Sequence, residues 1–295
     1  MNDLTYNDLH FQKDVNDRIS KKLNFIIECG KDILSFIKEF LLSANGHEQL
    51  KHHESFLYLI IKIRFNIESS LVLSELLKED YRYKTSVNIL FRSLIDDVIN
   101  LLYLLGFAVP NSIEQEALRN ELNILDKEFL ASSEQIINSE FENFNPFGFF
   151  EDEDLGKSLG ELRKSNSHLY DFELKKWKKK SEIRKGNHEY FNRFKLDNSS
   201  RFISEAQKIE FIKLNNFEGY HTLSYLNKYF TQYFHFSPKM HDFLLDDIDY
   251  DLQNYLMTFL EILTAIGIAN KVISLNDNKR IENEINRLIL SFQKK

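Results

Sequence analysis

The sequence predicts an all-α fold, a bundle of about eight or nine helices. Apolar residues recur three or four positions apart over most of the 295 residues, which is the helical period, and no segment alternates as a strand does. Only nine glycines and three prolines interrupt the chain, so long elements are expected. The 26 phenylalanines and 13 tyrosines predict a core rich in aromatic rings. We expect a flexible N-terminus at 1–13 and a single helical domain over 14–295.

The expected helices follow one another with few breaks, each supported by apolar residues one turn apart. In the first half of the chain they cover 14–42, 48–77, 83–107 and 112–138, and Pro110 closes the third. In the second half they cover 204–214, 219–236, 251–275 and 278–293. Between these halves, we expect further helix from residue 162 onward, through the polar stretch KKWKKK.

The segment SEFENFNPFGFFEDEDLGKSLG, residues 139–160, mixes asparagine, proline, glycine, phenylalanine and acidic residues. This composition predicts a long loop. This segment could serve as a flap over a site, as an interface or as a domain boundary. We favour a loop within one domain, because the helices on both sides are too apolar on one face to stand apart.

Composition excludes several classes of protein. The net charge of −7 does not indicate a nucleic-acid binder, although a local basic patch is compatible with it. The one cysteine, Cys29, excludes a disulfide within the chain and a cysteine-rich zinc site. The N-terminal residues are polar, and the apolar stretch LLYLLGFAV is far shorter than the roughly 20 residues that span a bilayer. We therefore expect a cytoplasmic protein with no membrane span.

Three motifs resemble metal sites, and each lacks a required ligand. In HEQLKHH, His47 and His52 are one position too far apart to share a helical face as in zinc proteases. The Glu-x-x-His of EGYH has no second copy, which a di-iron bundle needs. The segment DIDYD lacks the glycine and glutamate of a calcium loop. No metal or other cofactor is expected.

Helical ribonucleases of the HEPN type use an arginine followed closely by a histidine. Arg163 and His168 have this spacing, but a chain with nine histidines yields about one such match by chance. The serine- and asparagine-rich setting of this pair also suits a helix end or a turn. The pair is therefore no evidence for catalysis.

The segment NILFRSLIDDVINLLYLL, residues 88–105, has a polar stripe opposite its broad apolar face. Arg92, Asp96 and Tyr103 lie on that stripe, with Thr85 above them. Because Arg92 and Asp96 are four residues apart, they can form an ion pair. The pair is either a solvated surface contact or part of a stripe that faces a cleft, in which Asp96 holds Arg92 in place.

The segment YFTQYFHFSP, residues 229–238, has two faces as well. His235 shares a face with Thr231, Lys228 and Ser224. The opposite face carries the packing residues Leu223, Leu226, Phe230 and Tyr233. His235 either interacts with the helix dipole as a structural residue or acts in proton transfer near neutral pH.

The order of IKIRFNIESSLVLSELL, NILFRSLIDDVINLLYL, KKWKKK and YLNKYFTQYFHFSP resembles a prokaryotic all-helical family known only as a domain of unknown function. The resemblance covers roughly residues 56–260 and includes a tryptophan-bearing polar helix at KKWKKK. That family has an Arg-Ser-Leu-aliphatic-acidic motif and a later motif that ends in histidine. Arg92 and Asp96 match the first motif and His235 the second, and Thr231 stands where serine is usual.

Two functions remain open. The resemblance implies a HEPN-like effector that acts on RNA or a nucleotide, as a ribonuclease in phage defence or a toxin-like system. Arg92, Asp96 and His235 would then be catalytic, with Thr231 and Tyr103 in support. Trp177, Lys178 and Lys179 would contact nucleic acid, unless this basic stretch is only a solvated helix face. The alternative is a non-catalytic interaction module that binds itself as a homodimer or a protein partner, through the phenylalanines of FENFNPFGFF (141–150).

Overall fold

The structure is a computed structural model that describes residues 17–44, 53–80, 83–108, 112–143, 152–184, 203–215, 217, 219–233 and 248–294. Within these ranges the chain forms ten helices, nine of them with seven or more residues, and two strands of two residues each. The predicted all-α bundle is confirmed. The expected flexible segment at 1–13 lies outside the described residues.

The chain divides into two compact units. Unit 1 comprises Met1–Gly106 and Ser204–Lys295, and unit 2 comprises Phe107–Ile203. The single domain over residues 14–295 stays a prediction. Unit 2 is therefore an insertion in the sequence between two helices of unit 1.

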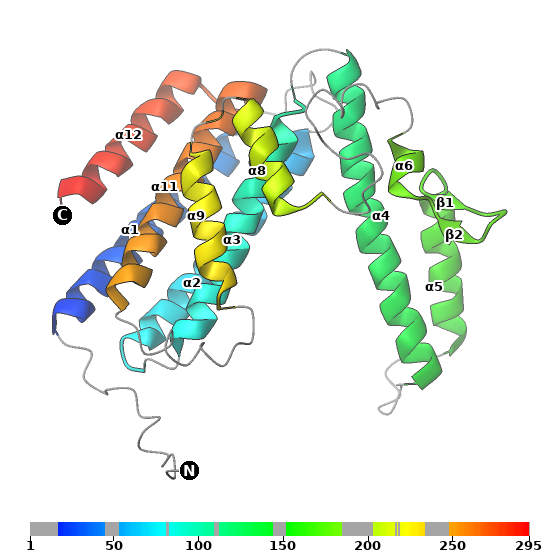
Figure 1. The fold of residues 1–295 in the computed structure, drawn as a ribbon, viewed down its shortest axis with the longest axis horizontal. Coiled ribbons are helices and arrows are strands. Elements are labelled where there is room, and N and C mark those ends of the chain that lie inside the picture. The colour runs from blue at the N-terminus through cyan, green and yellow to red at the C-terminus, as the bar shows by residue number, and fades with distance from the viewer. Residues whose placement is uncertain are drawn as a thin grey trace, which may run out of the picture. The chain divides into compact units, whose positions relative to one another are not determined.

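Unit 1 is a bundle of long helices from both ends of the chain (Figure 1). Its helices are α1 (Asp17–Ser43), α2 (His53–Leu77), α3 (Lys84–Leu105), α8 (Glu205–Leu214), α9 (Tyr220–Thr231), α11 (Ile248–Ile273) and α12 (Asn278–Lys294). The N-terminal helices α2 and α3 contact each other, and the C-terminal helices α11 and α9 pack against α3. The two parts of the sequence thus build one core.

Aromatic rings fill the centre of this core, as the composition predicts. Phe91 of α3 stacks on Tyr255 of α11 with ring centroids 4.1 Å apart. Phe259 and Phe230 lie 5.5 and 5.9 Å from Phe91. The predicted packing residues Leu223, Leu226 and Phe230 of α9 are buried, as is Tyr233 just beyond its end. The predicted apolar side of this helix is therefore the side that packs.

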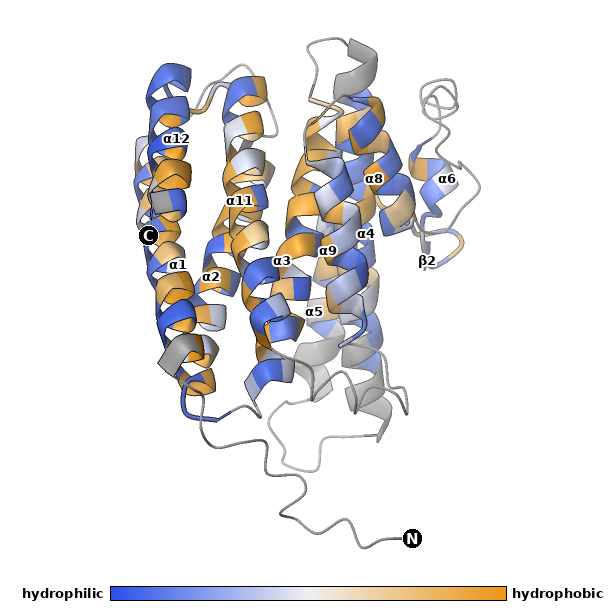
Figure 2. Cartoon of the chain, turned by 60° about the vertical axis from the view of Figure 1, so that its left-hand side comes forward, coloured by the Kyte–Doolittle hydropathy of each residue, from blue (hydrophilic) through white to orange (hydrophobic). Residues whose placement is uncertain are grey.

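The last helix shows most clearly why these segments fold as helices. Figure 2 shows hydrophobic and hydrophilic residues alternating along α12. Its buried residues Ile281, Ile285, Leu288 and Phe292 are three or four positions apart, so they form one stripe. Burial of this stripe holds α12 on α11 and α1.

Helix α11 is the one described helix that is long and apolar enough to cross a membrane. Only its length and composition mark α11 in this way. Of the 18-residue apolar stretch of α11 that could span a membrane, 56% is buried inside the structure. The buried face also carries the polar residues Asp251, Asn254 and Glu261. Burial of this kind is what the central helix of a helical core shows.

Unit 2 contains α4 (Ser112–Asn143), α5 (Asp152–Ser165), the strands β1 (Tyr170–Asp171) and β2 (Lys176–Trp177), and α6 (Lys180–Ile183). The predicted loop at 139–160 is too long. Helix α4 continues to Asn143 and α5 begins at Asp152, so only residues 144–151 lie outside the described part. Acidic residues stabilise a helix N-terminus, which is why Asp152, Glu153 and Asp154 belong to the first turn of α5.

The prediction of a polar helix through KKWKKK is wrong, because Lys176 and Trp177 form a strand of a β-hairpin and only the last lysine, Lys180, begins a helix, α6. Tyr170 pairs with Trp177 and Asp171 with Lys176 in an antiparallel register. The Asp171 carboxylate accepts hydrogen bonds from the backbone N–H groups of Glu173 and Leu174, which forms the turn. The turn chemistry of one aspartate and the Tyr170–Trp177 contact override the helical propensity of the lysines.

Candidate functional site on helices α3 and α9

Four polar residues lie one turn apart along α3: Lys84, Asn88, Arg92 and Asp96. Steps of four residues drift by about 40° each around a helix, so such a row winds from one face toward another. The exposed fractions follow this drift. Lys84 and Asn88 are buried, whereas the Arg92 and Asp96 side chains are 14% and 34% exposed. The row therefore begins in the core and ends at the surface.

At the surface end, α3 and α9 are joined through Arg92. Its Nε–H donates to Thr231 Oγ1 over 2.8 Å, and its Nη1 forms an ion pair with Asp96 Oδ1. The Asn227 amide also donates to Asp96 Oδ1, over 3.4 Å. The Thr231 hydroxyl in turn donates to the Asn227 carbonyl over 2.6 Å. Arg92 and Asp96 of the polar stripe predicted on α3 thus meet Thr231 of the stripe predicted on α9, and Asn227 joins the contact.

Arg92 is held in a defined orientation and remains available on one side. Burial lowers the pKa of Arg92, and the Glu205 carboxylate partly opposes this shift. An arginine side chain is not deprotonated in proteins, so the guanidinium stays charged. Among the described residues, none accepts a hydrogen bond from its Nη2. A planar guanidinium anchored at two nitrogens is suited to bind a phosphate through the third.

At the buried end lies a second ionic centre, which the sequence interpretation missed. Lys84 Nζ is 3.0 Å from Asp251 Oδ2, close enough for an ion pair although off the direction of a hydrogen bond. The hydroxyls of Tyr229 and Tyr233 both donate to Asp251 Oδ1 over 2.9 Å. Burial, followed by the charge of Asp251, raises the pKa of both tyrosines. The spacing of four between Tyr229 and Tyr233 is the signal that predicts a shared partner.

Helix α9 is positioned by its first residues. Gly219 precedes it with a φ of 86°, and a Cβ there would lie 2.2 Å from Glu261 Oε2. Only glycine combines this backbone angle with so close an approach. The Glu261 carboxylate therefore lies at the positive end of α9. Burial raises the pKa of Glu261 to about 7, with a small opposing effect of the Thr222 hydrogen bond.

Of the other two predicted site residues of unit 1, the structure describes only Tyr103, which does not join this cluster. Tyr103 is buried against Phe211 of α8, with ring centroids 5.3 Å apart, and it lies 11 positions beyond Arg92 on α3. That separation is about 16 Å along a helix. His235 lies outside the described residues, four positions beyond Thr231.

The predicted nucleic-acid contacts lie in unit 2. The Trp177 indole N–H donates to Glu134 Oε2 over 2.5 Å, and its ring packs edge-on against Tyr170. Lys178 donates to the His168 carbonyl over 2.8 Å, and Lys179 is exposed. Trp177 and Lys178 are therefore engaged within the unit. Their role in binding nucleic acid stays a prediction.

Glu134 is also the partner of Arg163, the arginine of the chance match to the HEPN spacing. Arg163 forms an ion pair with Glu134 and lies over the Tyr170 ring at 5.4 Å. The hydrogen bond with Glu134 raises the pKa of Arg163. His168 is exposed beyond the helix end. These contacts suit a structural role for Arg163, which agrees with the chance origin of the match.

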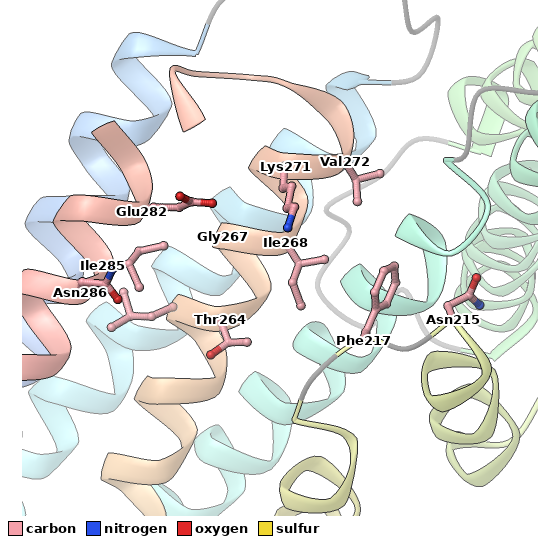
Figure 3. Close-up of a pocket in the computed structure, with 11 residues that line it drawn as sticks. Asn215, Phe217, Thr264, Gly267, Ile268, Lys271, Val272, Glu282, Ile285 and Asn286 are labelled. Atoms are coloured by element: carbon pink, nitrogen blue, oxygen red, sulfur yellow. The ribbon is translucent and has the colours of Figure 1, made fainter. Parts of the chain in front are cut away.

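A cleft of about 620 Å³ lies elsewhere in unit 1, between α11, α12 and the segment that precedes α9 (Figure 3). Its polar lining includes Lys271 and Glu282, and its apolar lining includes Ile268 and Ile285. None of the residues around Arg92 lines it. The cleft and the chemically distinctive cluster therefore do not coincide, and the charge and hydrogen bonds of Arg92 identify the better candidate site.

No group of three or more histidine, cysteine, aspartate or glutamate residues in the described ranges could hold a metal ion. The candidate site is thus an arginine, a carboxylate, a hydroxyl and an amide that join two helices of unit 1. Searches with family models, among curated proteins and among solved structures found no match to the chain.

Proposed function

We propose that the protein is a helical effector of the HEPN-like kind, which acts on RNA or a nucleotide in phage defence or a toxin-like system. Arg92 binds a phosphate group of the substrate, and His235 transfers a proton. Asp96 and Thr231 hold Arg92 in place. The observation that carries the proposal is the 2.8 Å hydrogen bond from Arg92 Nε to Thr231, which lies four positions before His235 in the sequence.

The chemistry follows from the two groups. Phosphoryl transfer accumulates negative charge on the phosphate oxygens, and a fixed guanidinium stabilises that charge without reorganising. Histidine has a pKa near neutrality, so it can take a proton from the attacking hydroxyl or give one to the leaving oxygen. Asp96 holds Nη1 and Thr231 holds Nε, which leaves Nη2 as the nitrogen that would bind the phosphate.

The first test is the variant Arg92→Lys, which keeps the charge and loses the planar fork. We expect a decrease of about 100-fold or more in RNA cleavage by the purified protein, the usual cost of losing a transition-state donor. Arg64→Lys is a matched control, because Arg64 also pairs with a carboxylate four residues on, Glu68 at 2.9 Å. The control should cleave at the rate of the native chain.

The same variants can be compared in cells. Expression of the native chain should slow bacterial growth and deplete RNA, whereas Arg92→Lys and His235→Ala should relieve both effects. Equal growth for all of these chains, together with intact RNA in vitro, would overturn the proposal.

The alternative, a non-catalytic interaction module, is favoured by a different observation. The cleft of unit 1 is not lined by Arg92, Asp96 or Thr231, so these residues could serve only to join α3 and α9. The predicted contact FENFNPFGFF lies largely outside the described residues. If the protein is an interaction module, Arg92→Lys would lower its stability slightly. RNA would stay intact with both the native chain and the variant, which distinguishes the two functions.

A further inference from the structure

The outward side of α2 and the turn that follows it carries a row of residues with heptad spacing. Successive positions are four and three residues apart, which brings them into one line on a helix. We call this row the α2 seam: Tyr58, Lys62, Phe65, Ser69, Val72, Leu76 and Glu79. All seven are exposed to solvent. The spacing is that of a helix whose seam is covered by another helix.

The apolar members of the seam are unusually exposed. Tyr58, Phe65 and Val72 keep 66%, 55% and 64% of their surface, and Leu76 keeps 37%. The opposite side of α2 is already in the core, where Ile60, Ile63 and Ile67 are fully buried. A helix at the surface of a bundle is normally polar on its outer side. Four exposed apolar residues in one such row indicate a surface that is covered in the working protein.

We propose that the α2 seam binds the α2 seam of a second copy of this chain, with the two helices antiparallel. The charges of the seam carry the choice of partner and direction. Its two charged residues are Lys62 near one end and Glu79 at the other. A parallel pair would place Lys62 against Lys62 and Glu79 against Glu79, whereas an antiparallel pair places opposite charges together.

The spacing also defines the register. If Lys62 of each copy faces Glu79 of the other, then Phe65 faces Leu76 and Ser69 faces Val72. The remaining layers repeat these contacts by two-fold symmetry. The charged residues then close both ends of an apolar centre. Lys62 is already held by Asp97, with 2.5 Å between Nζ and Oδ1, which leaves its side chain 60% exposed at the surface. This inference is independent of the reaction proposed at Arg92.

The size of the seam predicts a weak dimer. From Tyr58 to Glu79 the row extends about 32 Å, and a helix with its side chains is about 10 Å wide. The contact is smaller than the about 800 Å² per partner of a standard stable interface. A dissociation constant of about 1 to 100 µM is therefore expected. The dimer should therefore predominate at protein concentrations above the dissociation constant and dissociate when the protein is diluted below it.

Sedimentation velocity of the full chain from about 1 to about 300 µM tests the association. The native chain should change from monomer to dimer across this range. Phe65→Glu places a charge in the seam and should weaken association at least about 30-fold. Leu290→Glu on α12 is the matched control, because Leu290 is 51% exposed and lies outside the seam. Circular dichroism should show both variants folded, since neither residue is buried.

Disulfide trapping tests the direction and the register. A mixture of Phe65→Cys and Leu76→Cys chains should form a mixed cross-linked dimer, because these positions face each other. Neither variant should cross-link with itself, since the two copies of one position are separated by about 16 Å along the helices. The native Cys29 is buried and does not compete.

Three outcomes overturn the proposal. A monomer at every concentration would mean that the seam has another occupant, such as a different protein or unit 2 of the same chain. A dimer that Phe65→Glu leaves intact would place the interface elsewhere. Self-cross-linking of Phe65→Cys, without the mixed product, would show a parallel pair. Loss of RNA cleavage in Arg92→Lys with an intact dimer would separate this inference from the proposed function.

Discussion

The two ionic centres of α3 differ in their surroundings although they lie on one row of residues. Lys84 and Asp251 are 2% and 1% exposed at the side chain, and two tyrosine hydroxyls complete the centre. Arg92 and Asp96 are 14% and 34% exposed, and a threonine and an asparagine join them. The first centre is enclosed by protein groups. The second borders solvent on one side.

This difference separates structural from functional roles. A buried ion pair is costly to disrupt, because removal of one partner leaves an uncompensated charge away from water. A partly exposed pair adds little to stability, because water screens it and can replace either partner. Only the second centre can exchange water for a substrate. We therefore assign the packing of α3, α9 and α11 to the first centre and the proposed chemistry to the second.

The largest expected effect is at Asp251. Asp251→Ala leaves the Lys84 ammonium buried without its counter-charge and removes the acceptor of two tyrosine hydroxyls. We expect a loss of about 3–5 kcal/mol in the free energy of unfolding, measured with urea. The double variant Lys84→Met with Asp251→Ala should recover part of this loss. If the double variant is less stable than Asp251→Ala, the ion pair does not carry the effect.

The second-largest effect on stability is expected at Glu261, a buried carboxyl that forms no ion pair with a described residue. Burial raises its pKa in the folded chain to about 7, from an ordinary value of 4.5. Folding then favours the protonated form, so this group's contribution to stability is present below about pH 4.5 and is lost as the pH rises through 7. The shift of the pKa from 4.5 to about 7 corresponds to about 3 kcal/mol in the free energy of unfolding.

Glu261→Gln should remove that dependence. The variant should match the native chain at pH 5 and exceed it in unfolding free energy at pH 8. Urea unfolding at both pH values measures the difference. An equal difference at the two pH values would show that Glu261 stays ionised beside the N-terminus of α9.

The smallest effect on stability is expected at Asp96. Because its side chain is 34% exposed, Asp96→Ala should change the free energy of unfolding by less than about 1 kcal/mol. RNA cleavage should nevertheless fall, since Arg92 loses the group that fixes Nη1. A parallel loss of stability and activity would instead place this centre with the structural one. Thermal melting and a cleavage assay on the same preparation provide the comparison.

Much of the fold follows from local patterns. The apolar spacing predicts the helices of unit 1 closely, and it predicts that Phe230 of α9 packs while Thr231 does not. The same reasoning fails at Trp177, where a side-chain hydrogen bond at Asp171 makes a turn that lysine-rich composition does not reveal. It also fails at Asp251, which the sequence shows only as the last residue of the incomplete calcium-loop match DIDYD, with no sign that Lys84 is its partner.

By itself, the sequence determined which residues are helical and which face of each helix is apolar, because both depend on neighbours within a few positions. Only the tertiary structure decided that Arg92 meets Thr231, which lies 139 positions away, and that Lys84 meets Asp251. Those contacts depend on how far each helix is rotated and shifted against the next. Rotation and shift are set by the packing of rings such as Phe91 and Tyr255, which a linear pattern does not encode.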